Sequence, residues 1–184
     1  MINTQRAARQ RPVKTLVLGG CRSGKSRYAE QWVGENFSDM VFVATLEARN
    51  DAEMDQRIAL HRQSRGLGWL TVEEPLDLAG VLAKNETGAE AFLVDCLTMW
   101  LTNMMMQGLG DERIQEEVGR LCQTVRGLEV SVVLVANEVG LGIVPESPLG
   151  RRFRDLAGWT NQQMAAVCGQ VVLVAAGLPL RLKG

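Results

Sequence analysis

The sequence has few of the residues that build metal centres and disulfide frameworks. It contains one histidine, and its four cysteines, at positions 21, 96, 122 and 168, include no C-x-x-C pair. A single histidine with scattered cysteines cannot complete a zinc site, and thiols stay reduced by default in the cytoplasm. We therefore expect a cytoplasmic protein whose cysteines are neither paired nor bound to zinc.

Long apolar runs and a strong net charge are absent too. No run reaches the length of a transmembrane helix, the N-terminal segment is too polar for a signal peptide, and the net charge is -1. These absences argue against stable membrane insertion and against nucleic acid as a partner. Residues 1–12 contain several arginines, and we interpret them as a flexible extension, with a binding arm as the alternative.

The rest of the chain, residues 13–184, has the size and composition of a single globular domain. The sequence has 184 residues, of which 46% are hydrophobic, and this length suits one sizeable core. Strands are predicted at residues 13–18, 40–45, 70–73, 91–95, 130–136 and 171–175. Helices are predicted at about residues 24–33, 51–65, 75–84, 97–106, 112–126 and 149–167. This alternation predicts an α/β fold, a mostly parallel sheet with helices on both faces.

The first predicted strand leads into GGCRSGKS, which has the spacing G-x-x-x-x-G-K-S. Between a strand and a helix this spacing predicts a P-loop NTPase fold, because backbone N–H groups and the helix dipole can hold phosphates. The α/β pattern fits the RecA-like type of this fold. Lys25 can reach the β and γ phosphates, and Ser26 can bind Mg²⁺. The alternative is a turn that merely uses glycine. The expected nucleotide-binding residues of the loop are Gly19, Gly20, Cys21, Arg22, Ser23, Gly24, Lys25 and Ser26.

Asp95 is the second candidate for binding Mg²⁺. It ends a predicted strand of apolar residues, and a carboxylate at that place can meet the ion directly or through water. An aspartate there could instead cap the helix predicted to begin near Leu97. The P-loop upstream favours the metal role, and the two roles are compatible.

The only histidine, His61, is a candidate nucleophile. On a helix Glu53, Arg57 and His61 share one face, and further arginines follow. With an ordinary pKa of about 6.5, a histidine is largely neutral near pH 7, and it can attack phosphorus to form a covalent phosphoramidate. From helix geometry alone the alternative is a plain surface or half-buried histidine on a solvated, charged face.

Longer segments resemble one enzyme family. They are GGCRSGKS, VATLEA, DAEMDQRIALHRQSR, WLTVEEP, LVDCLTMWLTN and LVANEVGLGIVPESPLGRRFRDLAGWTNQQMA, in that order. Together they resemble the bifunctional adenosylcobinamide kinase / adenosylcobinamide-phosphate guanylyltransferase family of cobalamin biosynthesis. The resemblance runs from about residue 15 to residue 174, and the segments at residues 57–62 and 137–146 are the most specific.

The resemblance implies two reactions. ATP or GTP would phosphorylate adenosylcobinamide, and GTP would then transfer GMP to adenosylcobinamide phosphate, giving adenosylcobinamide-GDP. It also implies that His61 carries GMP as a covalent intermediate and that the chain forms a homo-oligomer, a trimer in relatives. Mg²⁺ is the cofactor expected from the P-loop and Asp95. The family's other GTP contacts correspond to Thr45, Leu46, Glu47, Arg62, Gln63, Ser64, Arg65 and Glu73.

Several residues keep open interpretations. We hypothesise that the Glu73 carboxylate accepts hydrogen bonds from guanine. Asn137 and Glu138 could position a water, a hydroxyl or Mg²⁺, or could fix the following loop. Arg151 and Arg154 could meet phosphates, or be ordinary exposed arginines. Two other functions fit the P-loop, a kinase for another small molecule and a RecA-like ATPase module, but both leave His61 idle.

Overall fold

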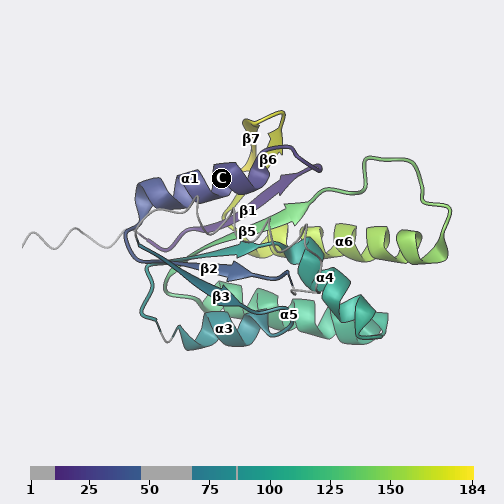
Figure 1. Ribbon diagram of the computed structural model, residues 1–184, viewed down its shortest axis with the longest axis horizontal. Coiled ribbons are helices and arrows are strands. Elements are labelled where there is room, and N and C mark those ends of the chain that lie inside the picture. The colour runs from purple at the N-terminus through teal and green to yellow at the C-terminus, as the bar shows by residue number, and fades with distance from the viewer. Residues whose placement is uncertain (1–10, 47–67, 86) are drawn as a thin grey trace, which may run out of the picture.

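The computed structural model describes residues 11–46, 68–85 and 87–184. Seven strands form one sheet in the order β3-β2-β4-β5-β1-β6-β7 (Figure 1). Six of them run parallel, and β7 pairs antiparallel with β6. The strands are β1 (Lys14–Gly19), β2 (Met40–Ala44), β3 (Trp69–Glu73), β4 (Ala91–Asp95), β5 (Ser131–Asn137), β6 (Gln170–Ala175) and β7 (Leu178–Lys183).

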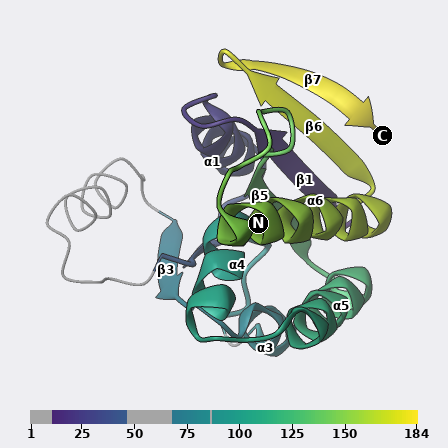
Figure 2. The same cartoon turned by 90° about the vertical axis from the view of Figure 1, so that its right-hand side faces the viewer.

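Helices cover both faces of this sheet, as the sequence predicts. The helix α1 lies on one face, and α3, α5 and α6 lie on the other (Figures 1 and 2). Along the parts of the chain that the structure describes, no helix combines the length and the apolar character needed to span a bilayer. The helices are α1 (Lys25–Asn36), α3 (Leu78–Lys84), α4 (Leu97–Met106), α5 (Asp111–Gly127) and α6 (Pro148–Val167). The helix predicted at residues 51–65 lies outside the described residues.

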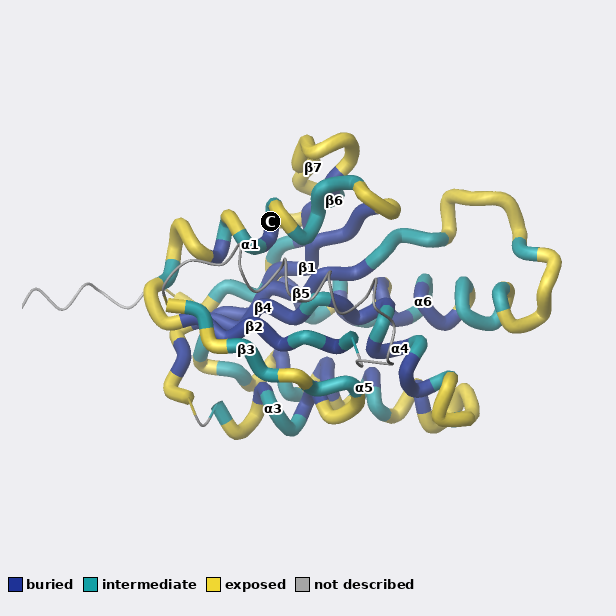
Figure 3. Tube along the Cα trace, viewed as in Figure 1, coloured by how far each residue is buried: buried dark blue, intermediate teal, exposed yellow. Residues whose placement is uncertain are grey.

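The core lies on both sides of the central strands. Residues 91–94 of β4 and 131–136 of β5 are all buried, because helices cover both faces and leave no strand face for solvent (Figure 3). Of the methionine-rich segment in α4, Trp100 and Met104 are buried in this core, while Met106 is 61% exposed.

The strand registers bring the carboxyl ends of the parallel strands to one edge of the sheet. Ala44 of β2 pairs with both Glu73 and Asp95. Farther along the sheet, Gly19 of β1 pairs with Asn137 of β5. In open α/β sheets this edge is where ligands bind. The fold thus collects the predicted strand-end residues on one side of the molecule.

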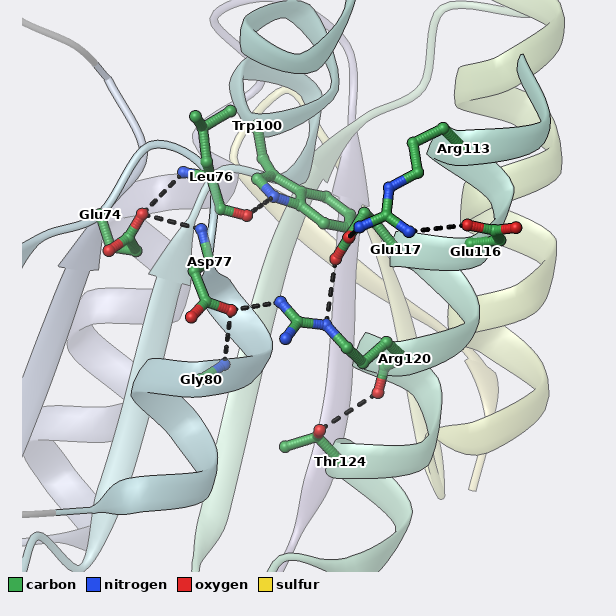
Figure 4. A network of polar contacts seen from close by, with 10 residues as sticks. All are labelled: Glu74, Leu76, Asp77, Gly80, Trp100, Arg113, Glu116, Glu117, Arg120 and Thr124. Carbon is green, nitrogen blue, oxygen red and sulfur yellow. Dashed lines mark hydrogen bonds and ion pairs between the residues drawn. The ribbon is translucent and has the colours of Figure 1, made fainter. Parts of the chain in front are cut away.

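The helix α3 begins three residues later than predicted. Pro75 does not open it; the N-cap is Asp77, whose carboxylate accepts a hydrogen bond from the Gly80 N–H at 3.0 Å. The same carboxylate pairs with Arg120 of α5 (Figure 4). An aspartate cap satisfies a free N–H of the first turn, and a proline at position 75 supplies no such acceptor side chain.

The strand β7 is absent from the predicted elements. It follows β6 after a two-residue turn in which Ala176 and Gly177 have positive φ angles of 50° and 80°. Two positive φ angles are typical of the turn that joins tight hairpins. Three leucines alternate along β7, but they remain 55% to 72% exposed. An edge strand of this kind lacks the continuous apolar run by which the buried strands are recognised.

Candidate phosphate-binding site

The P-loop closes tightly against the ends of two strands. The Ser23 N–H donates to the Gly20 carbonyl at 3.2 Å, and the Glu138 N–H donates to the Gly19 carbonyl at 3.1 Å. A Cβ atom on Gly19 would lie 2.4 Å from Ser23 Oγ and 2.6 Å from the Val174 carbonyl oxygen. Only glycine fits at this position, so the first glycine of the motif has a steric cause.

The end of the loop depends on the β6–β7 turn. Gly24 has a φ of 94°, which favours glycine, and it is the N-cap of α1. The Gly177 N–H donates to the Ser23 carbonyl at 2.8 Å, and a Cβ on Gly24 would lie 3.2 Å from the Gly177 Cα. The β6–β7 hairpin, which is absent from the predicted elements, therefore supports the P-loop. Figure 2 shows this hairpin beside α1. An Ala-Gly pair before alternating leucines was the signal for it.

The charges of Lys25 and Asp95 both influence the pKa of one buried thiol, that of Cys96. Lys25 Nζ donates to the Gly20 carbonyl at 3.2 Å, so the ammonium group lies over its own loop. The pKa of the Cys96 thiol is raised to about 11, first by burial and then by the charge of Asp95, while the charge of Lys25 opposes the shift. The predicted phosphate-binding lysine and the predicted metal-binding carboxylate therefore belong to one neighbourhood.

Asp95 does not cap the following helix, so that alternative is wrong. The N-cap of α4 is Cys96, whose Sγ accepts from the Met99 N–H at 3.4 Å. The strand β5 lies between β1, which leads to Ser26, and β4, which ends at Asp95. The two strands are therefore two strand spacings, or about 10 Å, apart.

One hydroxyl and one carboxylate on separate elements suit an ion that keeps several waters and binds phosphate oxygens, as Mg²⁺ does. Among the described residues, no group of three or more His, Cys, Asp or Glu side chains could hold a metal by itself. Ser26 and Asp95 thus fit a Mg²⁺ ion brought with a nucleotide.

Thr45 follows β2 at this edge and is completely buried. Its hydroxyl exchanges hydrogen bonds with the Cys96 backbone, accepting from the N–H and donating to the carbonyl, both at 2.8 Å. Its carbonyl accepts from Asn103 Nδ2 at 2.7 Å. These contacts position the Asp95–Cys96 segment, and the GTP contact expected for Thr45 stays a prediction. Leu46, next to it, is half-buried.

Asn137 and Glu138 leave the end of β5 beside the P-loop. The Asn137 N–H donates to Thr98 Oγ1 at 2.7 Å, and Glu138 Oε1 accepts from the Gly140 N–H at 2.7 Å. Arg151 Nη1 donates to the Pro145 and Glu146 carbonyls, at 3.1 and 2.5 Å. The Glu138 carboxylate and Arg151 thus have loop-fixing contacts, and the loop itself is largely exposed (Figure 3).

Glu73 lies at the same edge but far from the P-loop along the sheet. Its strand β3 is four strands from β1, or about 19 Å at the usual strand spacing. Its role in reading guanine stays a prediction. The remaining predicted residues, Glu47, His61, Arg62, Gln63, Ser64 and Arg65, lie outside the described residues.

Comparison with known proteins gives consistent results. Residues 15–182 match the family described as cobinamide kinase / cobinamide phosphate guanyltransferase. The bifunctional adenosylcobalamin biosynthesis protein CobP of Pseudomonas aeruginosa is 44% identical over 172 residues, covering 94% of this chain and 98% of the relative. The corresponding protein CobU of Escherichia coli is 40% identical over 180 residues, covering 91% of this chain and 98% of the relative.

A solved structure from Pyrococcus horikoshii OT3, described as a structural study of Project ID PH0250, has a TM-score of 0.56 at 9% identity. The likeness covers 95% of this chain and 88% of that one, and it bears on the fold alone. The P-loop, the strand order and the match along residues 15–182 lead to one conclusion. The chain belongs to the cobinamide kinase / cobinamide phosphate guanyltransferase family.

Proposed function

We propose that this protein phosphorylates adenosylcobinamide with ATP or GTP and then transfers GMP from GTP to adenosylcobinamide phosphate. The observation that carries the proposal is a complete P-loop in a chain that matches this family along residues 15–182. The relatives are named as bifunctional adenosylcobalamin biosynthesis proteins, and the match covers 98% of each of them. One chain of this size can therefore carry both activities.

In the first reaction the P-loop would hold the phosphates of the donor. The loop N–H groups and the α1 dipole attract the anion, and Lys25 neutralises charge as the γ-phosphoryl group moves to the corrinoid hydroxyl. Ser26 and Asp95 would hold Mg²⁺, which when bound supplies further positive charge to the phosphate oxygens. Thr45 and Cys96 keep the Asp95 segment in place through their paired hydrogen bonds.

In the second reaction the same loop would hold the β and γ phosphates of GTP. His61 would attack the α phosphorus, forming a phosphorus–nitrogen bond while pyrophosphate leaves with the electron pair of the broken bond. An oxygen of adenosylcobinamide phosphate would then displace GMP from His61. We expect this reaction in the cytoplasm, where ATP and GTP are supplied, and from a homo-oligomer.

A two-stage assay tests the proposal. Purified protein is incubated with adenosylcobinamide and ATP, then with GTP, and the products are followed by mass spectrometry. We expect adenosylcobinamide phosphate first and adenosylcobinamide-GDP second. Phosphate product without the GDP product would indicate a kinase alone. ATP hydrolysis with no corrinoid product would indicate the ATPase alternative and overturn the proposal.

A further inference from the structure

Arg154 is half-buried, and its Nη1 atom is buried with no hydrogen-bond partner among the described residues. Its Nη1 atom is one of four buried side-chain polar atoms without a hydrogen bond in the described chain, with Ser23 Oγ, Asn137 Oδ1 and Thr160 Oγ1. It is the only charged group among them. Burying part of a guanidinium without an acceptor costs free energy, and such groups are normally paired.

The neighbouring arginines of α6 show what a structural arginine does here. Arg151 donates to the Pro145 and Glu146 carbonyls, and Arg152 pairs with Asp111 at 2.6 Å and donates to the Leu109 carbonyl. Both fix the ends of loops. No hydrogen bond or ion pair of this kind belongs to Arg154 within the described residues. Within the described part of the chain, its guanidinium therefore fixes no loop or helix end by hydrogen bonding.

Helix geometry places Arg154 above the carboxyl edge of the sheet. It precedes Asn161 by seven residues, so the two share a face of α6 about 10 Å apart along the axis. Asn161 Nδ2 donates to the Asn137 carbonyl at 3.2 Å, at the end of β5 and next to Gly19. The first turns of α6 extend past the strand ends (Figure 1). The guanidinium thus belongs to the side of the molecule on which the P-loop lies.

An anion is the partner that this group lacks. A guanidinium is always charged, offers a planar fork of donors and matches phosphate oxygens in a bidentate manner. The proposed reactions bring one phosphoryl group to this edge: the γ-phosphoryl group of the donor, which then becomes the phosphate of the corrinoid. The donor's γ-phosphoryl group and the corrinoid phosphate present the same kind of oxygen atoms. One residue can therefore bind the group before and after its transfer.

We propose that Arg154 binds the transferred phosphoryl group, an inference that rests on the proposed function. In the transfer, the corrinoid hydroxyl oxygen bonds to the γ phosphorus, and the bond from that phosphorus to the β–γ bridging oxygen breaks. The electron pair leaves with the nucleoside diphosphate, and the hydroxyl proton goes to solvent. Arg154 gives up no proton; it donates hydrogen bonds to the phosphoryl oxygens, where charge is spread in the transition state.

The test compares Arg154→Ala and Arg154→Lys with Arg126→Ala, a matched control on the exposed last turn of α5. Because Arg154 has no partner to lose, we expect Arg154→Ala to keep the wild-type melting temperature. The kcat for phosphorylation should fall on the order of 10²- to 10³-fold, as when one transition-state donor is removed. Arg154→Lys should keep part of this kcat, and added guanidinium should raise the kcat of Arg154→Ala. The control Arg126→Ala should have the wild-type kcat.

Binding measurements give a second readout. ADP should bind Arg154→Ala as it binds wild type, whereas a non-hydrolysable ATP analogue should bind more weakly. Wild-type kcat in Arg154→Ala, or a lower melting temperature with no guanidinium rescue, would overturn the inference. If wild-type protein forms no corrinoid phosphate, the proposed function fails, and the comparison of ADP with the ATP analogue still decides whether Arg154 meets the terminal phosphate.

Discussion

At the scale of single residues, Cys21 differs from the other three cysteines in its accessibility. It is exposed within the P-loop, whereas Cys96, Cys122 and Cys168 are buried. Burial raises the pKa of Cys168 to about 12 and of Cys96 to about 11, so these thiols stay protonated and unreactive at pH 8. We expect a thiol reagent at pH 8 to label one cysteine rapidly in the native protein and all four after unfolding.

Mg²⁺ with ATP should slow this rapid labelling, because phosphates in the cradle would cover Cys21. A Cys21→Ser variant is the control, and it should lose the rapid phase. If nucleotide leaves the rate unchanged, Cys21 does not line the occupied phosphate site. If two or more thiols react rapidly, the core around at least one of the three buried cysteines opens more readily than its burial indicates.

The sequence predicted which residues form the site, but it could not predict the hydrogen bonds that these residues make with one another. Spacing alone predicts that Lys25 holds phosphate, because the motif needs only local chain geometry. Thr45 and Cys96 lie 51 residues apart, and their mutual hydrogen bonds depend on β2 and β4 being neighbours. Such contacts follow from the fold, so the sequence carried no sign of the bonds between Thr45 and Cys96 and left Asp95 open as a possible helix cap.

At the scale of elements, the β6–β7 turn should matter to nucleotide binding although it lies outside the motif. Gly177 has a φ of 80°, so alanine there is strained by about 1–2 kcal/mol. Its N–H donates to Ser23 in the P-loop, and strain in the turn should displace that bond. We expect Gly177→Ala to lower the free energy of unfolding by about that amount and to raise the KM for ATP.

Gly108 provides the matched control. Its φ is 78°, and a Cβ there would meet nothing within 4 Å, as at Gly177, but it lies in the turn after α4. Gly108→Ala should cost a similar free energy of unfolding and leave the KM for ATP unchanged. Equal KM values in the two variants would show that the hairpin does not support the cradle.

The elements that could be predicted are those with local signals. All six predicted strands are present because each is a short stretch rich in apolar or β-branched residues, and α4 has the bounds predicted for it. The strand β7 was not predicted because its alternating leucines are exposed and form no continuous apolar run. The start of α3 was misplaced because Pro75 suits a first turn, whereas the side chain that caps the helix belongs to Asp77.

At the scale of the whole molecule, strand order decides how the site is assembled. The sequence predicts parallel strands but gives no order among them, and the placement of β5 between β1 and β4 had no local signal. This order puts two strand spacings between β1, which leads to Ser26, and β4, which ends at Asp95, and it places Asn137 of β5 between them. It also puts Glu73 four strands from β1, so a GTP held by both ends would have to span about 19 Å.

The central claim is that one phosphate cradle serves both reactions. It makes Lys25 necessary for GMP transfer as well as for phosphorylation, although the covalent intermediate would form on His61. His61→Ala should take up no label from GTP labelled at the α phosphate, and this variant sets the background.

The most direct measurement is the rate at which the Lys25→Ala protein becomes labelled by α-labelled GTP at saturating Mg²⁺. The shared cradle predicts a rate lower by on the order of 10²- to 10³-fold than in wild type. Labelling of Lys25→Ala at the wild-type rate would contradict it and would require a second, separate site for the triphosphate of GTP.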